Sequence, residues 1–270
     1  MKKLYLVATF LLVAAALTFF TSCEKTGNEP TGVALTADGD TMVKITWTAP
    51  TEGTPDKYIV YFKAVSAASY TNVDEVTATT YTHSPAGATG DYYVAAKYGS
   101  NEYDSDVKTT IPIHATAVTV AELNATGNAG YGWTRSNGAA GTYSMLQAAN
   151  ASAVDLYISN WVTGYAGTPY YVISPDLGPT DPGNAGVPTG GWRLNGISAN
   201  SVAEQGPLPE HTGSNYVSST SISTDPIFLG VWTADGYFAL IKASGINTGA
   251  GTVSVESYFQ LVKGLRLIKH

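Results

Sequence analysis

The sequence VKITWT at residues 43–48 decides the fold of this chain. Its large apolar residues Val43, Ile45 and Trp47 alternate with lysine and threonine, and this period of two is typical of a β-strand with one buried face. Pro50 and the Gly-Thr-Pro-Asp sequence at 53–56 follow, and glycine and proline are the strongest signals that a regular element ends. The stretch therefore predicts a half-buried strand that ends in a turn.

Two segments downstream repeat the alternation. The Ala-Thr-Gly sequence at 88–90 is a turn signal before the second of them, and Lys97 falls on its outward face. Short strands with turn signals every ~8–12 residues are typical of an antiparallel β-sandwich, which we expect for residues 32–113. The residues predicted to face inward are Tyr58, Val60 and Phe62 in the first segment and Tyr92, Val94 and Ala96 in the second.

These segments resemble a fibronectin type III domain. The motifs that carry the resemblance are Trp47-x-x-Pro50, Tyr58-x-Val60-x-Phe62, Tyr92-x-Val94-x-Ala96 and the Asn-Glu-Tyr-Asp-Ser sequence at 101–105. Around residues 81–90 the chain departs from the family, because the usual leucine has no obvious counterpart. The resemblance implies a spacer or adhesive module rather than a catalyst, and it implies that Trp47 and Tyr92 belong to the core.

The composition narrows the classes of function. The chain has 14 Lys plus Arg against 21 Asp plus Glu, a net charge of −7, so it lacks the basic surface that nucleic acid requires. It has one cysteine, which excludes a disulfide framework and a cysteine metal site. Only 13% of the residues are charged, and its many Thr, Ser, Gly and Tyr favour strands and turns over helices.

The N-terminus predicts export from the cytoplasm. A basic head, Met1-Lys2-Lys3, precedes an uncharged apolar run over residues 4–20 and a small-residue pair before Cys23, which is the pattern of a signal peptide. It resembles the bacterial lipoprotein signal, with Phe20 in place of the usual leucine. That resemblance implies removal of residues 1–22, diacylation of Cys23, for example with palmitate, and a polar tether over 23–31. An uncleaved anchor helix and a secreted protein with a spare cysteine are the alternatives.

Residues 114–270 are predicted to form a second antiparallel β-sandwich. The junction is placed at Ile111–His114, because Pro112 cannot extend a central strand. The Thr-Ala-Asp-Gly sequence at 233–236 is a strong hairpin signal. The predicted strands are Thr119–Leu123, Val154–Ser159, Tyr170–Ile173, Ile227–Trp232, Tyr237–Ala243 and Thr252–Leu261. Of these, the strand at 227–232 is apolar on both faces and is expected to be central.

The last strands resemble those of HmuY-like lipoproteins. The resemblance is carried by the hairpin at 233–242, by residues 251–260 and by the Val-Asp-Leu-Tyr-Ile sequence at 154–158, where Val154 replaces a tryptophan. Better-known members of that family bind haem through two histidines. The candidates here are His114, His211 and His270, whose spacing gives no reason to expect two at one site.

The stretch at 174–225 is rich in proline, glycine and serine, and loops of this length in a compact domain are usually functional or disordered. We expect these and neighbouring loops to present aromatic rings to a ligand. For Trp192 the alternative is that it fastens a long crossover to the core. The candidate binding residues are Trp161, Tyr165, Trp192 and Tyr216.

Enzyme signatures are poor. The sequence at 196–200 lacks the closing glycine of a nucleophile elbow, and there is no paired-histidine zinc motif. We therefore expect no catalytic residue, no bound metal and no resident cofactor.

The sequence predicts a lipid-anchored protein of the cell outer membrane that is exposed at the cell surface and binds an extracellular glycan or protein without catalysing a reaction. The alternatives are haem capture and a structural surface role. Which leaflet carries the anchor and whether Thr41, in an Asp-Thr-Met triplet that resembles a glycosylation motif, is modified stay open.

Overall fold

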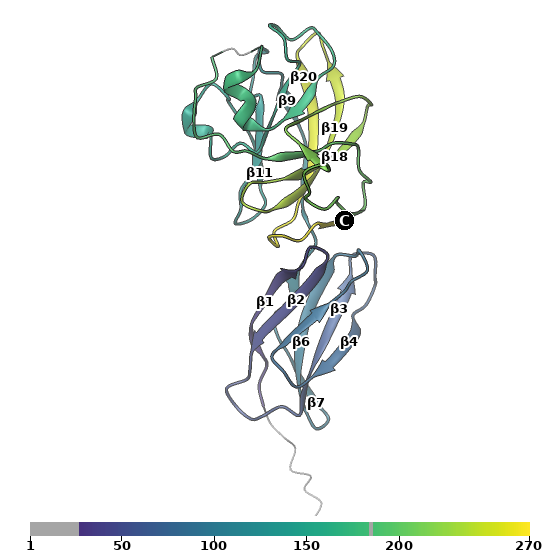
Figure 1. Ribbon diagram of the computed structural model, residues 1–270. Helices are drawn as coiled ribbons and strands as arrows, with labels where there is room; N and C mark the ends of the chain where they lie inside the picture. The colour runs from purple at the N-terminus through teal and green to yellow at the C-terminus, as the bar shows by residue number, and fades with distance from the viewer. Residues whose placement is uncertain (1–26, 184–185) are drawn as a thin grey trace, which may run out of the picture.

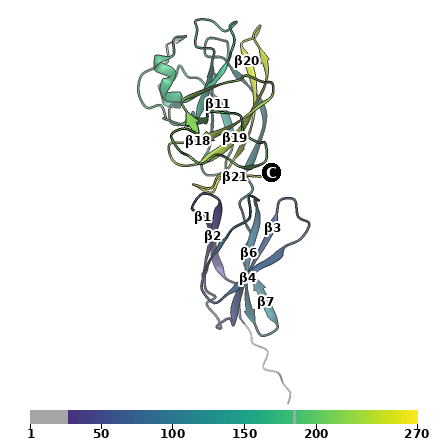
Figure 2. The same ribbon diagram turned by 45° about the vertical axis from the view of Figure 1, so that its right-hand side comes forward.

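The computed structural model describes residues 27–183 and 186–270. Cys23, the predicted signal peptide and most of the predicted tether lie outside the described residues. Figure 1 shows two β-rich lobes joined end to end, and the rotated view in Figure 2 shows the same arrangement. Within the described part of the chain, no helix is long and apolar enough to cross a membrane. The predicted all-β fold class, two antiparallel sandwiches in series, is confirmed.

The N-terminal sandwich is built from two sheets, with strand orders β1-β2-β5 and β4-β3-β6-β7, and β8 also pairs with β6. The sandwich therefore places a sheet of three strands against a sheet of five. The strands are β1 (Thr31–Asp38), β2 (Met42–Thr48), β3 (Lys57–Ala64), β4 (Thr71–Val76), β5 (Thr80–His83), β6 (Gly90–Tyr98), β7 (Asn101–Asp104) and β8 (Lys108–Thr109).

The apolar residues predicted from the alternation to face inward form the core of this sandwich. In β2 the side chains of Val43 and Ile45 are fully buried, and Trp47 packs edge-on against Tyr58 with ring centroids 5.3 Å apart. The two segments predicted to repeat the pattern are paired strands, since β3 and β6 run antiparallel in the same sheet. Tyr92 is fully buried and its hydroxyl lies 2.9 Å from Nδ1 of His83. The core roles implied for Trp47 and Tyr92 are therefore confirmed.

The C-terminal sandwich has sheets of five and six strands, in the orders β11-β10-β12-β13-β17 and β16-β14-β18-β19-β20-β9. The first sheet contains β10 (Gly130–Trp133), β11 (Ala140–Tyr143), β12 (Leu156–Ser159), β13 (Tyr171–Ile173) and β17 (Ser219–Ser221). The second contains β9 (Ile113–Ala121), β14 (Gly196–Ser198), β16 (Tyr216–Val217), β18 (Ile227–Trp232), β19 (Phe238–Asn247) and β20 (Thr252–Phe259). Two short 3-10 helices, η1 (Ala148–Asn150) and η2 (Pro175–Thr180), lie in its loops.

The longer predicted strands of this half coincide with observed ones. The strand predicted at 227–232 is β18, which lies inside its sheet between β14 and β19 as expected. The predicted hairpin follows it, with Gly236 at φ +88° and its amide donating to the Thr233 carbonyl at 2.7 Å. The strand predicted from Thr119 in fact begins at Ile113, immediately after Pro112. The prediction was short because Ala115–Ala117 supply no large residue to mark the alternation.

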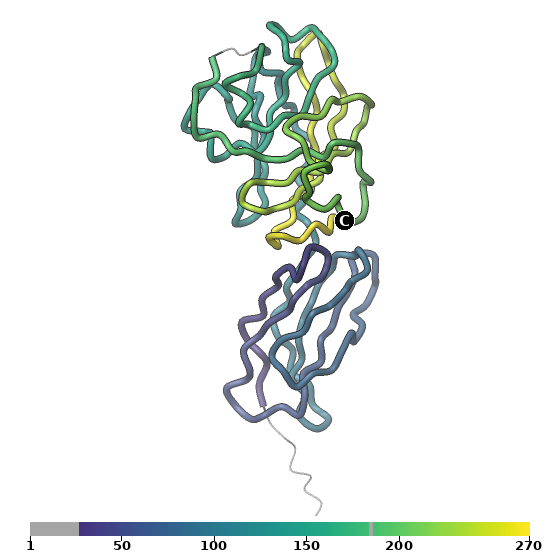
Figure 3. Tube along the Cα trace, viewed as in Figure 1, coloured from purple at the N-terminus to yellow at the C-terminus, as the bar shows by residue number. Residues whose placement is uncertain are grey.

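The segment after β20 returns to the N-terminal sandwich. Val262, Leu265 and Leu267 are members of the N-terminal core cluster, although they lie more than 150 residues beyond its last strand. Arg266 bonds to Asp40 twice, through its backbone amide to the carbonyl at 2.9 Å and through Nε to Oδ2 at 2.6 Å. Figure 3 shows this yellow segment between the two lobes. Within it, β21 (Leu267–Ile268) pairs with β15 (Gly206–Pro207).

Candidate functional site

The structure does not bring the four predicted binding residues to one surface. Trp161 and Trp192 both pack, half-buried, against the cluster that contains Met145 and Tyr157. Tyr216 lies on β16 and belongs to a different cluster, with Phe238 among its members. The Tyr165 ring lies closely against Gly251 at one end of β20.

The contacts of Trp161 and Trp192 are those of residues that hold loops in place. Trp161 has a positive φ of 61° and packs edge-on against Tyr171, with ring centroids 6.2 Å apart. The indole Nε1 of Trp192 donates to the Pro188 carbonyl at 2.8 Å, inside the same long loop. Part of the surface of each ring is therefore buried by the protein itself. The hydrogen bond to Pro188 supports the alternative that Trp192 fastens a long crossover to the core.

Tyr216 borders a small surface hollow of about 120 Å³, which we call the apolar hollow. On its rim, the side chains of Leu194 and Val217 are 64% and 38% exposed, which is high for aliphatic residues. Two of its lining rings are stacked, since His211 lies on Trp232 with ring centroids 3.7 Å apart and an interplanar angle of 12°. The full lining is Leu194, Asn195, Gly196, His211, Tyr216, Val217, Ser218 and Trp232.

The apolar hollow is electrically neutral. None of its lining residues is acidic, and burial lowers the pKa of His211, which favours the uncharged imidazole. Burial raises the pKa of Tyr216, and its hydroxyl is directed to the Pro209 carbonyl at 3.3 Å. The Asn195 amide is already used, because Nδ2 donates to the Asp155 carbonyl and Oδ1 accepts from the Ala234 amide, both at 2.8 Å. The hollow therefore suits an apolar group of modest size.

A buried ion network holds the loop that carries Leu194. Asp155 is fully buried, and its carboxylate accepts from Arg135 at 2.7 and 2.8 Å and from Arg193 at 3.0 Å. The Trp133 backbone amide donates to the same carboxylate at 3.0 Å. Charge-assisted hydrogen bonds of this kind are stronger and more directional than neutral ones. They fix the position of Arg193, and with it the chain on one side of the hollow.

Asp235, in the hairpin beside the hollow, completes the network. Arg135 Nε donates to its Oδ2 at 2.8 Å. Partial burial acts to raise the pKa of Asp235, but hydrogen bonds from Arg135 and Thr233 and the nearby positive charges outweigh it and lower the pKa to about 2. The guanidinium also lies over the rings of Tyr237 and Phe259, at 5.5 and 5.4 Å from their centroids.

Two of the three candidate histidines contact the same tyrosine ring, although their spacing in the sequence gave no reason to expect two at one site. His114 and His270 each stack nearly parallel on the Tyr258 ring, with centroid distances of 4.6 and 3.4 Å. Two stacked rings cannot share one face, so the imidazoles cover opposite faces of Tyr258. His114 Nε2 lies 2.8 Å from Glu256 Oε1, and His211 is elsewhere, on Trp232. Among the described residues, no group of three or more His, Cys, Asp or Glu could hold a metal ion.

The sequence did not single out Leu194, His211 and Trp232 as partners in one hollow. Leu194 lies in a loop, His211 in another loop, and Trp232 at the end of β18. The one available signal was Trp232 itself, a large ring at the exposed end of a strand that is apolar on both faces.

The geometry thus defines a class: an all-β protein of two sandwiches, with a neutral apolar hollow on the second. No protein-family model matches this sequence, and a search of curated proteins finds no match either. Solved structures similar to it include a fibronectin type III-like protein from Clostridium thermocellum, at 25% identity over 31% of this chain and 90% of that one, with a TM-score of 0.28. Another is FN3tt, which is 19% identical over 31% of this chain and 92% of that one, with a TM-score of 0.24. A two-domain fibronectin type III segment of chicken tenascin is 11% identical over 86% of this chain and 99% of that one, with a TM-score of 0.25.

Proposed function

We propose that this chain is a lipid-anchored cell-surface protein that binds an extracellular protein through the apolar hollow. The observation that carries the proposal is the exposed Leu194 and Val217 beside the stacked His211 and Trp232. Exposed apolar patches rimmed by polar residues mark interaction sites. The N-terminal sandwich acts as the spacer between the anchor at Cys23 and this site.

A polypeptide fits the hollow better than a glycan does. A sugar needs several free hydrogen-bonding groups, whereas the Asn195 amide is already engaged inside the protein. A volume of about 120 Å³ accommodates one aliphatic side chain. The edge strand β16 also borders the hollow and offers backbone groups to an extended segment of a partner, which is a common mode of peptide recognition.

Purified residues 24–270 should be tested on arrays of extracellular proteins and of glycans. We expect a protein hit whose affinity falls at least about tenfold in Leu194→Asp, because a carboxylate would then be desolvated in an apolar contact. Val118→Asp, on the exposed face of β9, is the matched control and should leave binding unchanged. A glycan hit abolished by Trp192→Ala, or equal losses in the two Asp variants, would contradict the proposal.

The anchor has its own test. Expression in a Gram-negative host with an azide-tagged palmitate should label the wild-type protein, while Cys23→Ser should lose the label because the thiol that carries the acyl chains is gone. Protease treatment of intact cells then distinguishes the outer face of the outer membrane from the periplasmic face. An unlabelled wild-type protein would argue against acylation.

Haem capture is the second candidate, and the convergence of His114 and His270 on Tyr258 is the observation that favours it. An iron ligand must point a ring nitrogen at the metal, so both imidazoles would have to leave the faces of Tyr258. Titration of the protein with haemin, followed in the Soret region, tests haem capture. A shift of the Soret band that is lost in His114→Ala would support haem capture, and an unshifted band would contradict it.

A further inference from the structure

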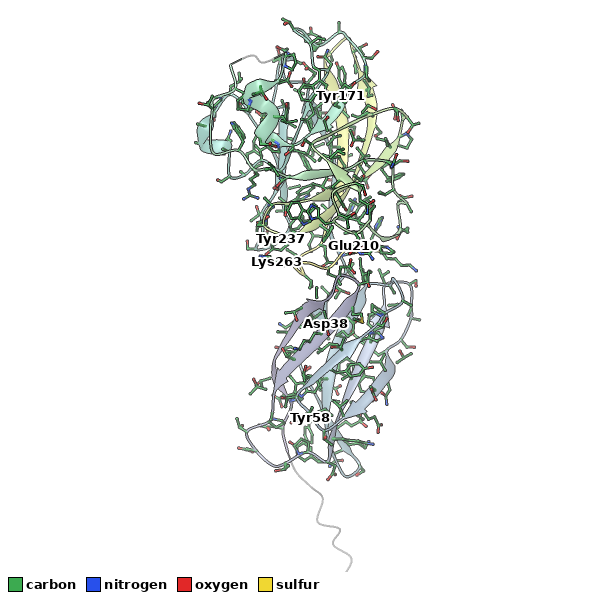
Figure 4. All side chains as sticks on the ribbon, viewed as in Figure 1. Asp38, Tyr58, Tyr171, Glu210, Tyr237 and Lys263 are labelled. Atoms are coloured by element: carbon green, nitrogen blue, oxygen red, sulfur yellow. The ribbon has the colours of Figure 1, made fainter. Side chains whose placement is uncertain are left out.

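A larger cavity, of about 470 Å³, lies where the two sandwiches meet, and we call it the junction cavity. Figure 4 labels Lys263, one of its lining residues, at the boundary between the two lobes. Its walls come from three segments: Leu35 and Thr36 of β1, residues 107–109 around β8, and residues 261–263 after β20. Small-molecule sites occur preferentially at domain interfaces, and their volumes are roughly 300–1,000 Å³.

The walls of the junction cavity are mainly apolar. Leu35, Leu261 and Val262 line it together with Val107, whose side chain is 52% exposed. An aliphatic residue left this open beside other apolar side chains is costly in water, because its hydration is unfavourable. A ligand with an apolar body would remove that surface from water.

The charged groups of the junction cavity are all positive. Lys108 and Lys263 line it and no aspartate or glutamate does. Among the described residues, neither ammonium group has a carboxylate within salt-bridge distance, whereas Lys57, Lys63 and Lys97 on the N-terminal sandwich each pair with one. In a chain whose net charge is −7, a cavity that carries only cations is a local reversal of sign, and such a concavity concentrates anions.

We infer that the junction cavity binds an amphipathic organic anion. Its apolar body lies against Leu35, Val107 and Val262, and its acidic head group, a carboxylate or a phosphate, lies at the ammonium groups of Lys108 and Lys263. This site is separate from the apolar hollow, which no cation lines. A ligand in it touches both the N-terminal sandwich and the segment that returns to it, so occupancy also stabilises the junction.

The test is a calorimetric titration of purified residues 24–270 with three twelve-carbon probes below their micelle-forming concentrations: laurate, dodecyl phosphate and dodecyltrimethylammonium. We expect one equivalent of laurate or dodecyl phosphate to bind, more weakly as salt is added because the charges are screened. The anion that binds more tightly identifies the head group as carboxylate or phosphate. Binding of the cationic probe with the affinity of the anions, or no binding of either anion, overturns the inference.

Variants locate the site. The double variant Lys108→Gln/Lys263→Gln should lower anion affinity at least about tenfold, since two charge-assisted contacts are lost. Val107→Asp should abolish binding, because it places a carboxylate in the wall. Lys44→Gln, at an exposed position of β2, is the control and should bind as the wild type does. Because Lys108, Lys263 and Val107 are exposed, these changes leave the fold intact, which thermal melts verify. Unchanged affinity in the double variant overturns the inference.

Discussion

The two sandwiches are held together in different ways. The N-terminal one has strands of up to nine residues whose alternating apolar side chains meet across two sheets. In the five-stranded sheet of the C-terminal one no strand exceeds four residues, and the loops between strands are long. There, a fully buried carboxylate with two arginine partners, Asp155, connects the loop that carries Arg193 to the end of the paired strands β10 and β12. The N-terminal core is thus built from apolar side chains, which include three from the returning segment, whereas the short strands of the C-terminal sandwich also depend on specific polar contacts.

The largest expected effect is on the polar contacts of the C-terminal sandwich. Asp155→Ala removes the buried carboxylate that accepts hydrogen bonds from Arg135, Arg193 and the Trp133 amide, so the two guanidinium groups lose their shared partner. Breaking a buried ion pair from one side costs about 4 kcal/mol of unfolding free energy. Chemical denaturation followed by tryptophan fluorescence measures it.

The exposed Asp106→Ala is the matched control and should stay within about 0.5 kcal/mol of wild type. If both aspartate variants unfold at the same denaturant concentration, the ion network does not hold the C-terminal sandwich and the contrast between the two halves fails.

A second change tests whether the N-terminal sandwich is closed by its own strands. Leu267 is fully buried in the N-terminal core, so Leu267→Ala should cost about 3 kcal/mol through lost burial and the cavity left behind. Hydrogen exchange should show faster exchange of the amides of β2 and β6. Protection that falls only in the C-terminal sandwich would show that Leu267 serves that half alone.

The fastening role of Trp192 predicts a smaller effect. Trp192→Phe keeps an aromatic ring but removes the donor to the Pro188 carbonyl, at a cost of about 1 kcal/mol. Limited proteolysis should cut residues 186–195 faster, while the N-terminal sandwich keeps its wild-type rate. An unchanged cleavage rate would leave the Trp192 ring free to serve a ligand.

The smallest expected effect is a pH dependence confined to the C-terminal sandwich. The pKa of Asp235 is lowered from its ordinary value of 3.8 to about 2, so its contribution is present above about pH 4 and is lost as the pH falls towards 2. Its side chain is 41% exposed, so solvent screening reduces the contribution to about 0.5 kcal/mol. Asp235→Asn should flatten the stability profile between pH 4 and 2, and an unaltered profile would count against the Arg135 pair.

The sequence was sufficient for the elements whose side chains alternate. In β2, β3 and β6 the large apolar residues mark the buried face. β18 was instead predicted as a strand apolar on both faces, and the hairpin signal at 233–236 separated it from β19. It did not reveal β10, β11, β14 or β17, because three- and four-residue strands such as Gly196–Ser198 contain too few side chains to show a period. Their positions come from contacts with distant segments.

The same reason explains the candidate site. Trp161 and Trp192 stood out by size and by their place in long loops, but residue type does not tell a ring that faces solvent from one that holds a loop. The apolar hollow joins Leu194, His211 and Trp232 from three separate segments. The buried contacts of Asp155 with Arg135 and Arg193 span 20 and 38 residues, and one sequence holds no signal for such pairings.

The returning segment also has a consequence for the order in which the chain is made. All eight strands of the N-terminal sandwich are synthesised before residue 110, yet part of their core is supplied by Val262, Leu265 and Leu267. During synthesis, domains generally fold as units from the N-terminus. The core of this first domain instead stays incomplete until more than 150 further residues have been synthesised, so it can close only after nearly the whole chain of the second domain has been made.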